Sequence, residues 1–150
     1  MITLSKIHLE DSATISTLVN LDQKYMQYPW NKEDWLCLNE SSSCYDLYQI
    51  IYDKKPIGFT LLEVSFEDQF VHLLKVVVEN DYRGQGFARQ ALEFLFNKYR
   101  EKKICSIYLE ASVSNSAAIK LYESLKFEVL VEKKRFYSDG SNAYAMQRIL

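Results

Sequence analysis

Apolar and polar residues alternate in three consecutive stretches of the first half of the chain, and this pattern predicts three β-strands. The stretches cover residues 45–52, 57–66 and 70–78, and the turns between them are polar, at residues 53–56 and 67–68. The last stretch ends in the wholly apolar run Val76 to Val78. Such a run is typical of a strand that is buried on both faces. The first half therefore predicts the hairpin-connected part of a sheet.

Four other stretches have the apolar spacing or the capping residues of helices. Asp11-Ser12 begins one helix and Asn31 begins a short second one. The strongest helical spacing covers residues 86–100, and another helix is expected over residues 115–125. Three further strands are expected at 104–110, 127–133 and 143–149. The predicted order is α-α-β-β-β-α-β-α-β-β, an α/β (α+β) fold with a mixed sheet flanked by helices.

Length and composition exclude several classes of protein. A chain of 150 residues fits one domain over residues 1–150, and 48% hydrophobic residues with 4 Gly and 2 Pro exclude a disordered or collagen-like chain. The net charge of −2 gives no reason to expect a nucleic-acid partner. No apolar run approaches the ~20 residues of a membrane span, and the N-terminus lacks the pattern of a signal peptide. We therefore expect a cytoplasmic protein without a membrane partner.

The chain has three cysteines, Cys37, Cys44 and Cys105, and two histidines, His8 and His72. An odd count without a C-x-x-C pair is not the pattern of a disulfide framework or of a zinc site, so no metal is expected. We expect each cysteine to be a small buried or half-buried residue, with Cys105 inside a strand. Residues 41–43, all serine, are expected to form an ordinary turn.

A loop with two glycines, Arg83 to Gly86, lies between the apolar strand and the strongest helix. Glycine allows a tight turn and close approach of a ligand, and the free N–H groups of a helix start favour an anion such as a pyrophosphate. A plain strand-to-helix turn is the alternative. A dinucleotide-binding site is a second alternative, but its third glycine position holds Arg89, and too little chain follows for a second half.

Residues 76–88 resemble the acetyl-CoA signature of the GNAT N-acetyltransferases, whose loop reads Q/R-x-x-G-x-G/A. The resemblance implies the GNAT fold, acetyl-CoA as cosubstrate, loop amides that hold its pyrophosphate, and a strand that pairs with its pantetheine arm. The cofactor-binding residues that it implies are Val76, Val77, Val78, Arg83, Gly84, Gln85, Gly86, Phe87, Ala88 and Arg89, with Asn115 as a helix cap that also contacts CoA.

Residues 109–127 resemble the stretch L-E-V-x-x-x-N-x-x-A-x-x-L-Y-x-x-x-G-F of one GNAT branch, the bacterial ribosomal-protein-alanine N-acetyltransferases (RimI type) and their relatives. Segments 28–30, 134–137 and 139–146 also match that branch, so the resemblance covers essentially the whole chain. It implies N-terminal protein acetylation, with the N-terminal alanine of ribosomal protein S18 as acceptor and direct attack in a ternary complex. The chain departs from the pattern at Lys126, where the family has Gly, and at Lys75, where it has a small polar residue.

Glu110 and Tyr122 are the catalytic residues that this resemblance implies. Glu110 ends a strand, where a carboxylate can take a proton from an amine directly or through a water, and Tyr122 can protonate the departing thiolate. Backbone N–H groups near Val77 would polarise the thioester carbonyl. Without the motif, Glu110 would be a solvated strand-end charge and Tyr122 a core aromatic.

Tyr28, Trp30 and Tyr137 are candidate walls of the acceptor site, although buried aromatics also serve packing alone. Two other functions remain open. One is acetylation of a small amine or of lysine side chains, and the other is a GNAT-fold module that holds CoA without turnover. The oligomeric state is also open, with a monomer favoured.

Overall fold

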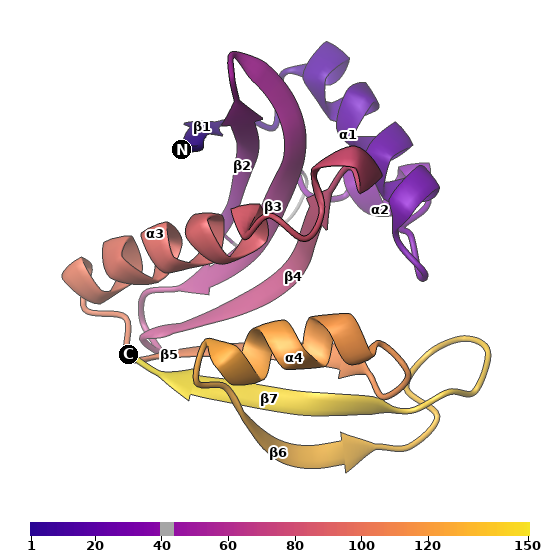
Figure 1. Cartoon of the computed structure of the whole chain (residues 1–150), viewed down its shortest axis with the longest axis vertical. Helices are drawn as coiled ribbons and strands as arrows, with labels where there is room; N and C mark the ends of the chain where they lie inside the picture. Colours follow the sequence, from indigo (N-terminus) through magenta and orange to yellow (C-terminus); the bar gives the residue numbers. More distant parts are fainter. Residues whose placement is uncertain (40–43) are drawn as a thin grey trace.

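The computed structural model, which describes residues 1–39 and 44–150, contains a seven-stranded sheet (Figure 1). The strands lie in the order β1-β2-β3-β4-β5-β7-β6. Among the described strands only β4 and β5 pair in parallel, because α3 carries the chain back between them. The strands are β1 (Thr3–Lys6), β2 (Cys44–Tyr52), β3 (Lys55–Ser65), β4 (Phe70–Val78), β5 (Ser106–Ser112), β6 (Glu128–Lys133) and β7 (Ala143–Ile149).

The helices begin at the capping residues that the sequence indicates. They are α1 (Ser12–Tyr25), α2 (Lys32–Leu36), α3 (Phe87–Glu101) and α4 (Ser116–Ser124), with a 3-10 turn η1 (Asn80–Tyr82) before the glycine loop. The Asp11 side chain accepts from the Thr14 amide, and Asn31 forms a reciprocal capping box with Asp34. Gly86 caps α3 and Asn115 caps α4.

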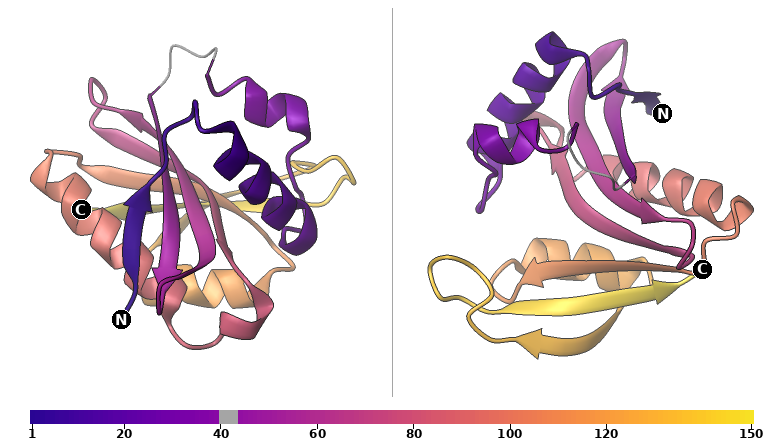
Figure 2. Two further views of the ribbon diagram at one scale, coloured as in Figure 1. Left: turned by 90° about the horizontal axis from the view of Figure 1, so that it is seen from above. Right: turned by 180° about the vertical axis from the view of Figure 1, so that it is seen from behind.

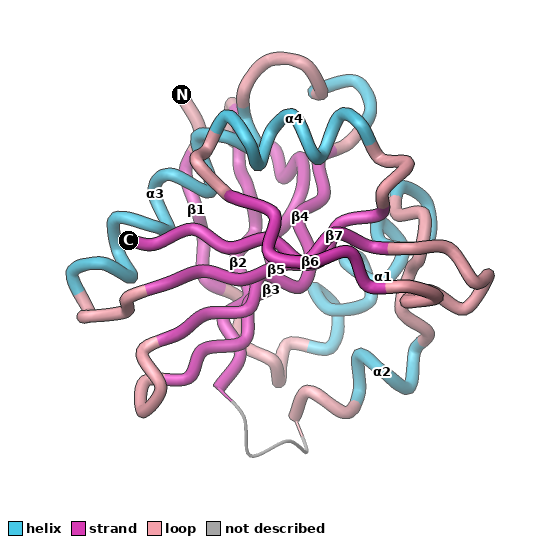
Figure 3. Tube along the Cα trace, turned by 90° about the horizontal axis from the view of Figure 1, so that it is seen from below, coloured by secondary structure: helices cyan, strands magenta, loops and turns pink. Residues whose placement is uncertain are grey.

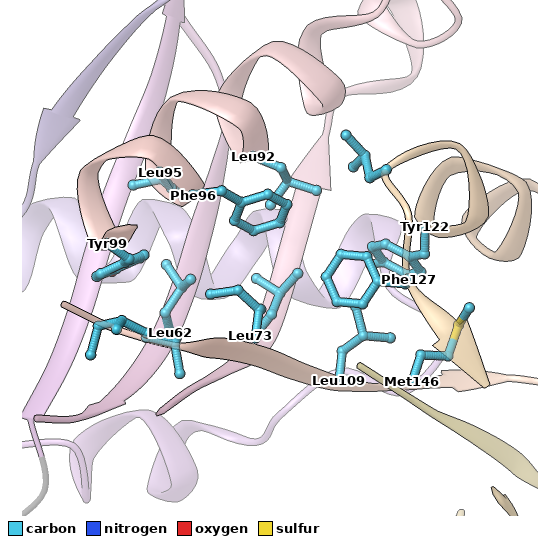
Figure 4. Close-up of a cluster of buried hydrophobic side chains, with 14 of the residues drawn as sticks. Leu62, Leu73, Leu92, Leu95, Phe96, Tyr99, Leu109, Tyr122, Phe127 and Met146 are labelled. Carbon is cyan, nitrogen blue, oxygen red and sulfur yellow. The ribbon is translucent and has the colours of Figure 1, made fainter. Parts of the chain in front are cut away.

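Helices lie on both faces of the sheet (Figure 3), and each face carries its own core of buried side chains. On one face α3 and α4 pack against the sheet through Leu92, Phe96 and Tyr122, and Figure 4 shows the α3 side chains directed toward the strands. On the other face α1 and α2 bury Leu18 and Trp35. Each fully buried side chain of this size contributes about 1.5–3 kcal/mol to folding. The fold class and the mixed, mostly antiparallel sheet are therefore confirmed.

β4 and β5 diverge along their length, as both views of Figure 2 show. They pair only from Phe70 with Ser106 to His72 with Tyr108. A bulge at Leu74 shifts the register of β4 against β3, since Leu73 pairs with Leu62 but Lys75 pairs with Leu61. In the described part of the chain, the edge of β4 beyond His72 that faces β5 has no strand partner. The divergence therefore leaves backbone groups of β4 available to a ligand.

The structure corrects two expectations. A strand, β1, precedes the first helix, so four strands and not three come before the glycine loop. This strand was missed because it is a four-residue edge strand with only Leu4 partly buried. The three cysteines are exposed, not buried, because Cys37 follows a helix end, Cys44 begins a strand, and Cys105 lies just before β5.

The expected serine turn at residues 41–43 lies outside the described residues. Within residues 1–39 and 44–150, no helix has both the length and the apolar character needed to cross a membrane.

Candidate active site

The opening between β4 and β5 forms a cleft of about 1000 Å³. It brings together parts of the chain that are far apart in sequence: the glycine loop, the end of β5, one side of α4, the α1–α2 loop and the β6–β7 loop. The expected site residues that line it are Tyr28, Trp30, Val76, Val78, Arg83, Gly84, Gly86, Phe87, Ala88, Arg89, Glu110, Asn115, Tyr122 and Tyr137. Val77 and Gln85 are not among the lining residues, and Val77 packs in the core under α1.

The glycine loop has the backbone conformation that its sequence indicates. Gly84 has φ +75° and Gly86 has φ +83°, both in the left-handed region that favours glycine. An added Cβ would meet no atom within 4 Å at either position, so the need for glycine comes from the backbone angle. Arg83 is held in place because its Nε donates to the Val78 carbonyl at 2.8 Å. The loop therefore presents the N-terminus of a long helix to the cleft, which suits a pyrophosphate.

Glu110 lies at the centre of a hydrogen-bonded cluster. His72 Nε2 lies 2.7 Å from Oε1, while Tyr108 OH and Lys133 Nζ each donate to Oε2 at 2.9 Å. The side chain is only 10% exposed, and β5 continues past it to Ser112, so Glu110 does not end its strand and is not a solvated charge. Burial alone raises the pKa of Glu110, but the bonds from His72, Lys133 and Tyr108 outweigh it and lower the pKa to about 2.

This cluster makes Glu110 a weak direct base. An α-ammonium group has a pKa of ~8, so transfer of its proton to a carboxylate of pKa about 2 is unfavourable by roughly six units, or about 8 kcal/mol. The cluster instead keeps Glu110 ionised at neutral pH. Its negative charge is then available to hold and polarise the groups that contact it.

Tyr122 is fixed by the way in which α4 ends. The amide of Phe127 donates to the Tyr122 carbonyl at 3.0 Å and the amide of Lys126 donates to the Glu123 carbonyl at 2.9 Å, which together form a Schellman motif. Lys126 has φ +68°, so the lysine adopts the left-handed conformation that glycine adopts more easily. The Phe127 ring packs edge-on against Tyr122 with 5.7 Å between centroids. The departure at Lys126 therefore leaves the position of Tyr122 intact.

The Tyr122 side chain combines the two roles considered from the sequence, a core aromatic and a residue of the site. Its ring belongs to the core and the residue is 8% exposed, yet it lines the cleft. Burial raises the pKa of its phenol, so the group keeps its proton. In the described residues no hydrogen bond joins the Tyr122 hydroxyl to another group, and the hydroxyl is therefore free to donate to a ligand.

Two aromatic side chains connect the loops on either side of the cleft. Tyr28 from the α1–α2 loop stacks on Tyr137 from the β6–β7 loop, with centroids 3.9 Å apart and rings 7° from parallel. The Tyr28 hydroxyl donates to Asp139 Oδ2 at 2.9 Å and lies 2.7 Å from Ser141 Oγ. Burial, with smaller effects of Tyr28 and Glu110, raises the pKa of Tyr137 to about 12, so its phenol is neutral.

Lys75 occupies the floor of the same end of the cleft. Its Nζ donates to Asp22 Oδ1 at 2.9 Å and lies 4.8 Å from the centroid of the Trp30 ring. Asp22 is fully buried and also accepts from the Trp30 amide and from Trp35 Nε1. Burial lowers the pKa of Lys75 and the bond to Asp22 opposes this effect. The departure from the family pattern at Lys75 is thus accommodated by a buried ion pair that also holds Trp30.

Sequence reasoning missed His72, Tyr108, Lys133 and Asp22 as parts of the site. A signal existed for His72 and Lys75, because each is a polar residue inside the otherwise apolar strand β4. Burial of such residues needs a partner, and a partner in a cleft indicates a functional site. Among residues 1–39 and 44–150, no three His, Cys, Asp or Glu side chains are grouped as they would be to hold a metal ion.

Comparison with known proteins identifies the family to which the chain is similar. The model of the acetyltransferase (GNAT) family matches residues 15–127. The ribosomal protein bS18-alanine N-acetyltransferase of Escherichia coli K12 is 27% identical over 142 residues, which cover 93% of this chain and 91% of the relative. An N-alpha-acetyltransferase of Saccharolobus solfataricus is 40% identical over 83 residues, 53% of this chain and 48% of the relative.

The solved structure of the ribosomal-protein-S18-alanine N-acetyltransferase from Escherichia coli superimposes with a TM-score of 0.84 at 26% sequence identity. The alignment covers 99% of this chain and 94% of that structure. The family match spans the glycine loop, Glu110 and Tyr122, and the fold agrees over nearly the full length. This chain is therefore a member of the GNAT family of N-acetyltransferases.

Proposed function

We propose that the protein transfers the acetyl group of acetyl-CoA to the α-amino group of a protein N-terminus, and that the N-terminal alanine of ribosomal protein S18 is the first acceptor to test. The observation that carries the proposal is the arrangement around one cleft. A glycine loop suited to an anion, the Glu110 cluster and the free Tyr122 hydroxyl all line it. The bS18-alanine N-acetyltransferase that resembles this chain over 93% of its length supports the choice of acceptor.

The residues present fit acetyl-CoA. The left-handed glycines at 84 and 86 open the start of α3 to a pyrophosphate, and Arg83 and Arg89 bring positive charge to the cleft. The unpaired edge of β4 up to Val78 can pair with the amides of a pantetheine arm as an added strand would. Asn115 lines the cleft and caps α4 through the Ala118 amide at 3.2 Å, which leaves its side-chain N–H₂ group available.

The reaction is direct attack in a ternary complex. The α-amine loses a proton to the hydrogen-bonded cluster around Glu110 and attacks the thioester carbonyl, so a C–N bond forms as the C–S bond breaks. The departing thiolate accepts a hydrogen bond, and then a proton, from the Tyr122 hydroxyl. A phenol whose pKa is raised by burial stays protonated until the thiolate appears. Backbone N–H groups near Val77 polarise the carbonyl.

The charge of the cleft favours an α-amine over a polyamine. Glu110 is the one acidic side chain that lines the cleft in the described part of the chain, and Lys133 already neutralises it. His72, Lys75, Arg83 and Arg89 line the same cleft. A polyamine carries several positive charges and needs carboxylates that are not already paired. A peptide N-terminus carries one ammonium group, with a pKa of ~7.7–8.0, and is easier to deprotonate than a lysine at ~10.4.

The test offers separate acceptors to the protein and measures the release of free CoA thiol. The acceptors are a peptide with the N-terminal sequence of S18, the same peptide with a blocked α-amine, and spermidine. We expect thiol release with the free α-amine alone. Release with spermidine alone would replace the proposal by small-amine acetylation. Binding of acetyl-CoA without release in any arm would identify a CoA-binding module without turnover.

A further inference from the structure

Three donors already occupy most of the acceptor positions of the Glu110 carboxylate. Oε1 faces His72, and Oε2 receives hydrogen bonds from both Tyr108 and Lys133. Protonation would remove the negative charge that all three donors contact and so weaken these bonds, one of which comes from the Lys133 ammonium group. The charged bond to Lys133 is also the kind that contributes most to stability. The geometry therefore suits a carboxylate that orients a neighbour.

The neighbour with a free acceptor atom is His72. Its side chain is 24% exposed and lines the cleft, and its ring packs edge-on against Tyr108 with 5.2 Å between centroids. An ionised carboxylate can only accept hydrogen bonds, so Nε2 of His72 carries the hydrogen that faces Glu110. In the neutral ring, Nδ1 then carries the lone pair. No hydrogen bond in the described residues engages Nδ1.

We propose that His72 takes the proton from the acceptor amine and that Glu110 is a positioning residue, which holds the imidazole tautomer and stabilises the imidazolium that forms. The proposal deepens, and rests on, the proposed acetyl transfer. Nδ1 of His72 takes a proton from the ammonium group and passes it to solvent, and the neutral amine then attacks as the C–N bond forms and the C–S bond breaks. Tyr122 gives its proton to the thiolate, and the second proton of the nitrogen leaves by way of His72 while Tyr122 is reprotonated. One turnover therefore yields an amide, a free thiol and one proton released to solvent.

Several charged or titratable groups surround His72. Glu110 and Tyr108 contact it from β5, Lys133 reaches Glu110 from the end of β6, and Glu63 is its register partner on β3. The proton can be taken only by a neutral imidazole, in which Nδ1 carries the lone pair.

The experiment compares His72→Gln with His8→Gln across pH, using the peptide with a free α-amine. The Gln side chain keeps an N–H donor for Glu110 but cannot take a proton. His8 is the other histidine of the chain, and it is exposed and outside the cleft. Near pH 7 we expect kcat to fall about 100-fold or more in His72→Gln, since general bases contribute ~10²–10⁴-fold. His8→Gln should match the unaltered protein.

The decisive readout is the dependence of this loss on pH. At a pH of about 9.5 an α-amine is already deprotonated, so the loss in His72→Gln should shrink to less than about 10-fold. The Kd for acetyl-CoA should stay within about 2-fold, because His72 lies near the start of β4 and the glycine loop follows the far end of that strand. A loss below about 3-fold at neutral pH, or a loss of the same size at every pH, would overturn the role of His72.

Two further measurements distinguish an error in the role of His72 from an error in the proposed function and from misfolding of the variant. If the unaltered protein acetylates spermidine or lysine instead, the proposed function fails, and the same variant ratio is measured with that amine. If His72→Gln does not fold, the two histidine ring signals of the unaltered protein are followed by NMR, with His8→Gln used for assignment. A ring at position 72 that is neutral where the enzyme is active supports the proposal. A ring that stays protonated throughout that range overturns it.

Discussion

The ammonium group of Lys75 lies 2.9 Å from Oδ1 of Asp22, and both side chains are at most 2% exposed. The pair joins β4 to α1, and through Asp22 it holds the Trp30 amide at 3.0 Å and Trp35 Nε1 at 3.1 Å. A buried ion pair is costly to form, but it is much more costly to break. We infer that this pair fixes the α1–α2 loop against the sheet and so shapes the acceptor end of the cleft.

Asp22→Asn should therefore destabilise the protein strongly. The substitution leaves the Lys75 ammonium group buried without its counter-ion, and breaking such pairs costs about 3–5 kcal/mol. Asp53→Asn is a matched control, because Asp53 is exposed and its φ of +48° suits Asn. The control should change the free energy of unfolding by less than about 0.5 kcal/mol. Urea denaturation measures both. A loss below about 1 kcal/mol in Asp22→Asn would show that the pair is not structural.

The hydrogen-bonded cluster around Glu110 predicts that the folded protein loses stability in acid. The pKa of Glu110 is about 2 in the folded protein against an ordinary value of 4.5. A lowered pKa stabilises the fold above pH 4.5, and this contribution disappears as the pH falls through the interval from 4.5 to 2. Its size is about 3 kcal/mol, since each pKa unit corresponds to about 1.4 kcal/mol. The difference in unfolding free energy between the unaltered protein and Glu110→Gln should shrink by this amount across the interval. A difference that does not vary with pH would contradict the claim that the cluster lowers the pKa of Glu110.

The sequence motifs predicted more of this site than the positions of the expected helices and strands did. The glycine loop and the stretch around Glu110 and Tyr122 could be placed from sequence because each is a continuous segment with its own residue pattern. The wholly apolar end of β4 predicted a strand buried on both faces, and the structure places β4 inside the sheet with Val77 and Val78 buried and Val76 half-buried. The strand β1 was missed because an edge strand of four residues has too little apolar pattern to detect.

The interactions among site residues could not be predicted in the same way. His72 and Glu110 are 38 residues apart, and Lys75 and Asp22 are 53 apart. Their contacts depend on the parallel register of β4 with β5 and on the position of α1, and a single sequence specifies neither. The contact of Glu110 with three donors is therefore a structural finding, and it changes the chemical role that the residue type alone suggested.

The glycine loop should control cofactor affinity. Gly84→Ala forces a Cβ onto a residue with φ +75°, which costs about 1–2 kcal/mol and displaces the loop amides. We expect the Kd for acetyl-CoA, measured by calorimetry, to rise about 10-fold. Gly140→Ala is the control, because Gly140 has φ +83° but lies in the β6–β7 loop. The control should lose similar stability with an unchanged Kd, and equal effects of both changes on the Kd would refute the assignment.

Lys126→Gly should stabilise the protein. The lysine has φ +68° at the end of α4, a conformation that costs a non-glycine residue about 1–2 kcal/mol. Glycine avoids this cost but loses about 0.4–1 kcal/mol through the freedom of the unfolded chain. A net gain of roughly 0.5–1 kcal/mol, seen as a higher Tm, is expected. Lys120→Gly inside the same helix should lose about 1 kcal/mol. A loss of stability in both variants would show that the left-handed lysine is not strained.

The most direct test of the account is the position of the acetyl group on a peptide that offers two amines. The peptide carries the N-terminal sequence of S18 with a free α-amine and one internal lysine, and tandem mass spectrometry locates the label after incubation with acetyl-CoA. The account predicts acetylation of the α-amine, with the lysine unmodified, and loss of the product in Tyr122→Phe. Acetylation of the lysine with a free α-amine left intact would contradict it.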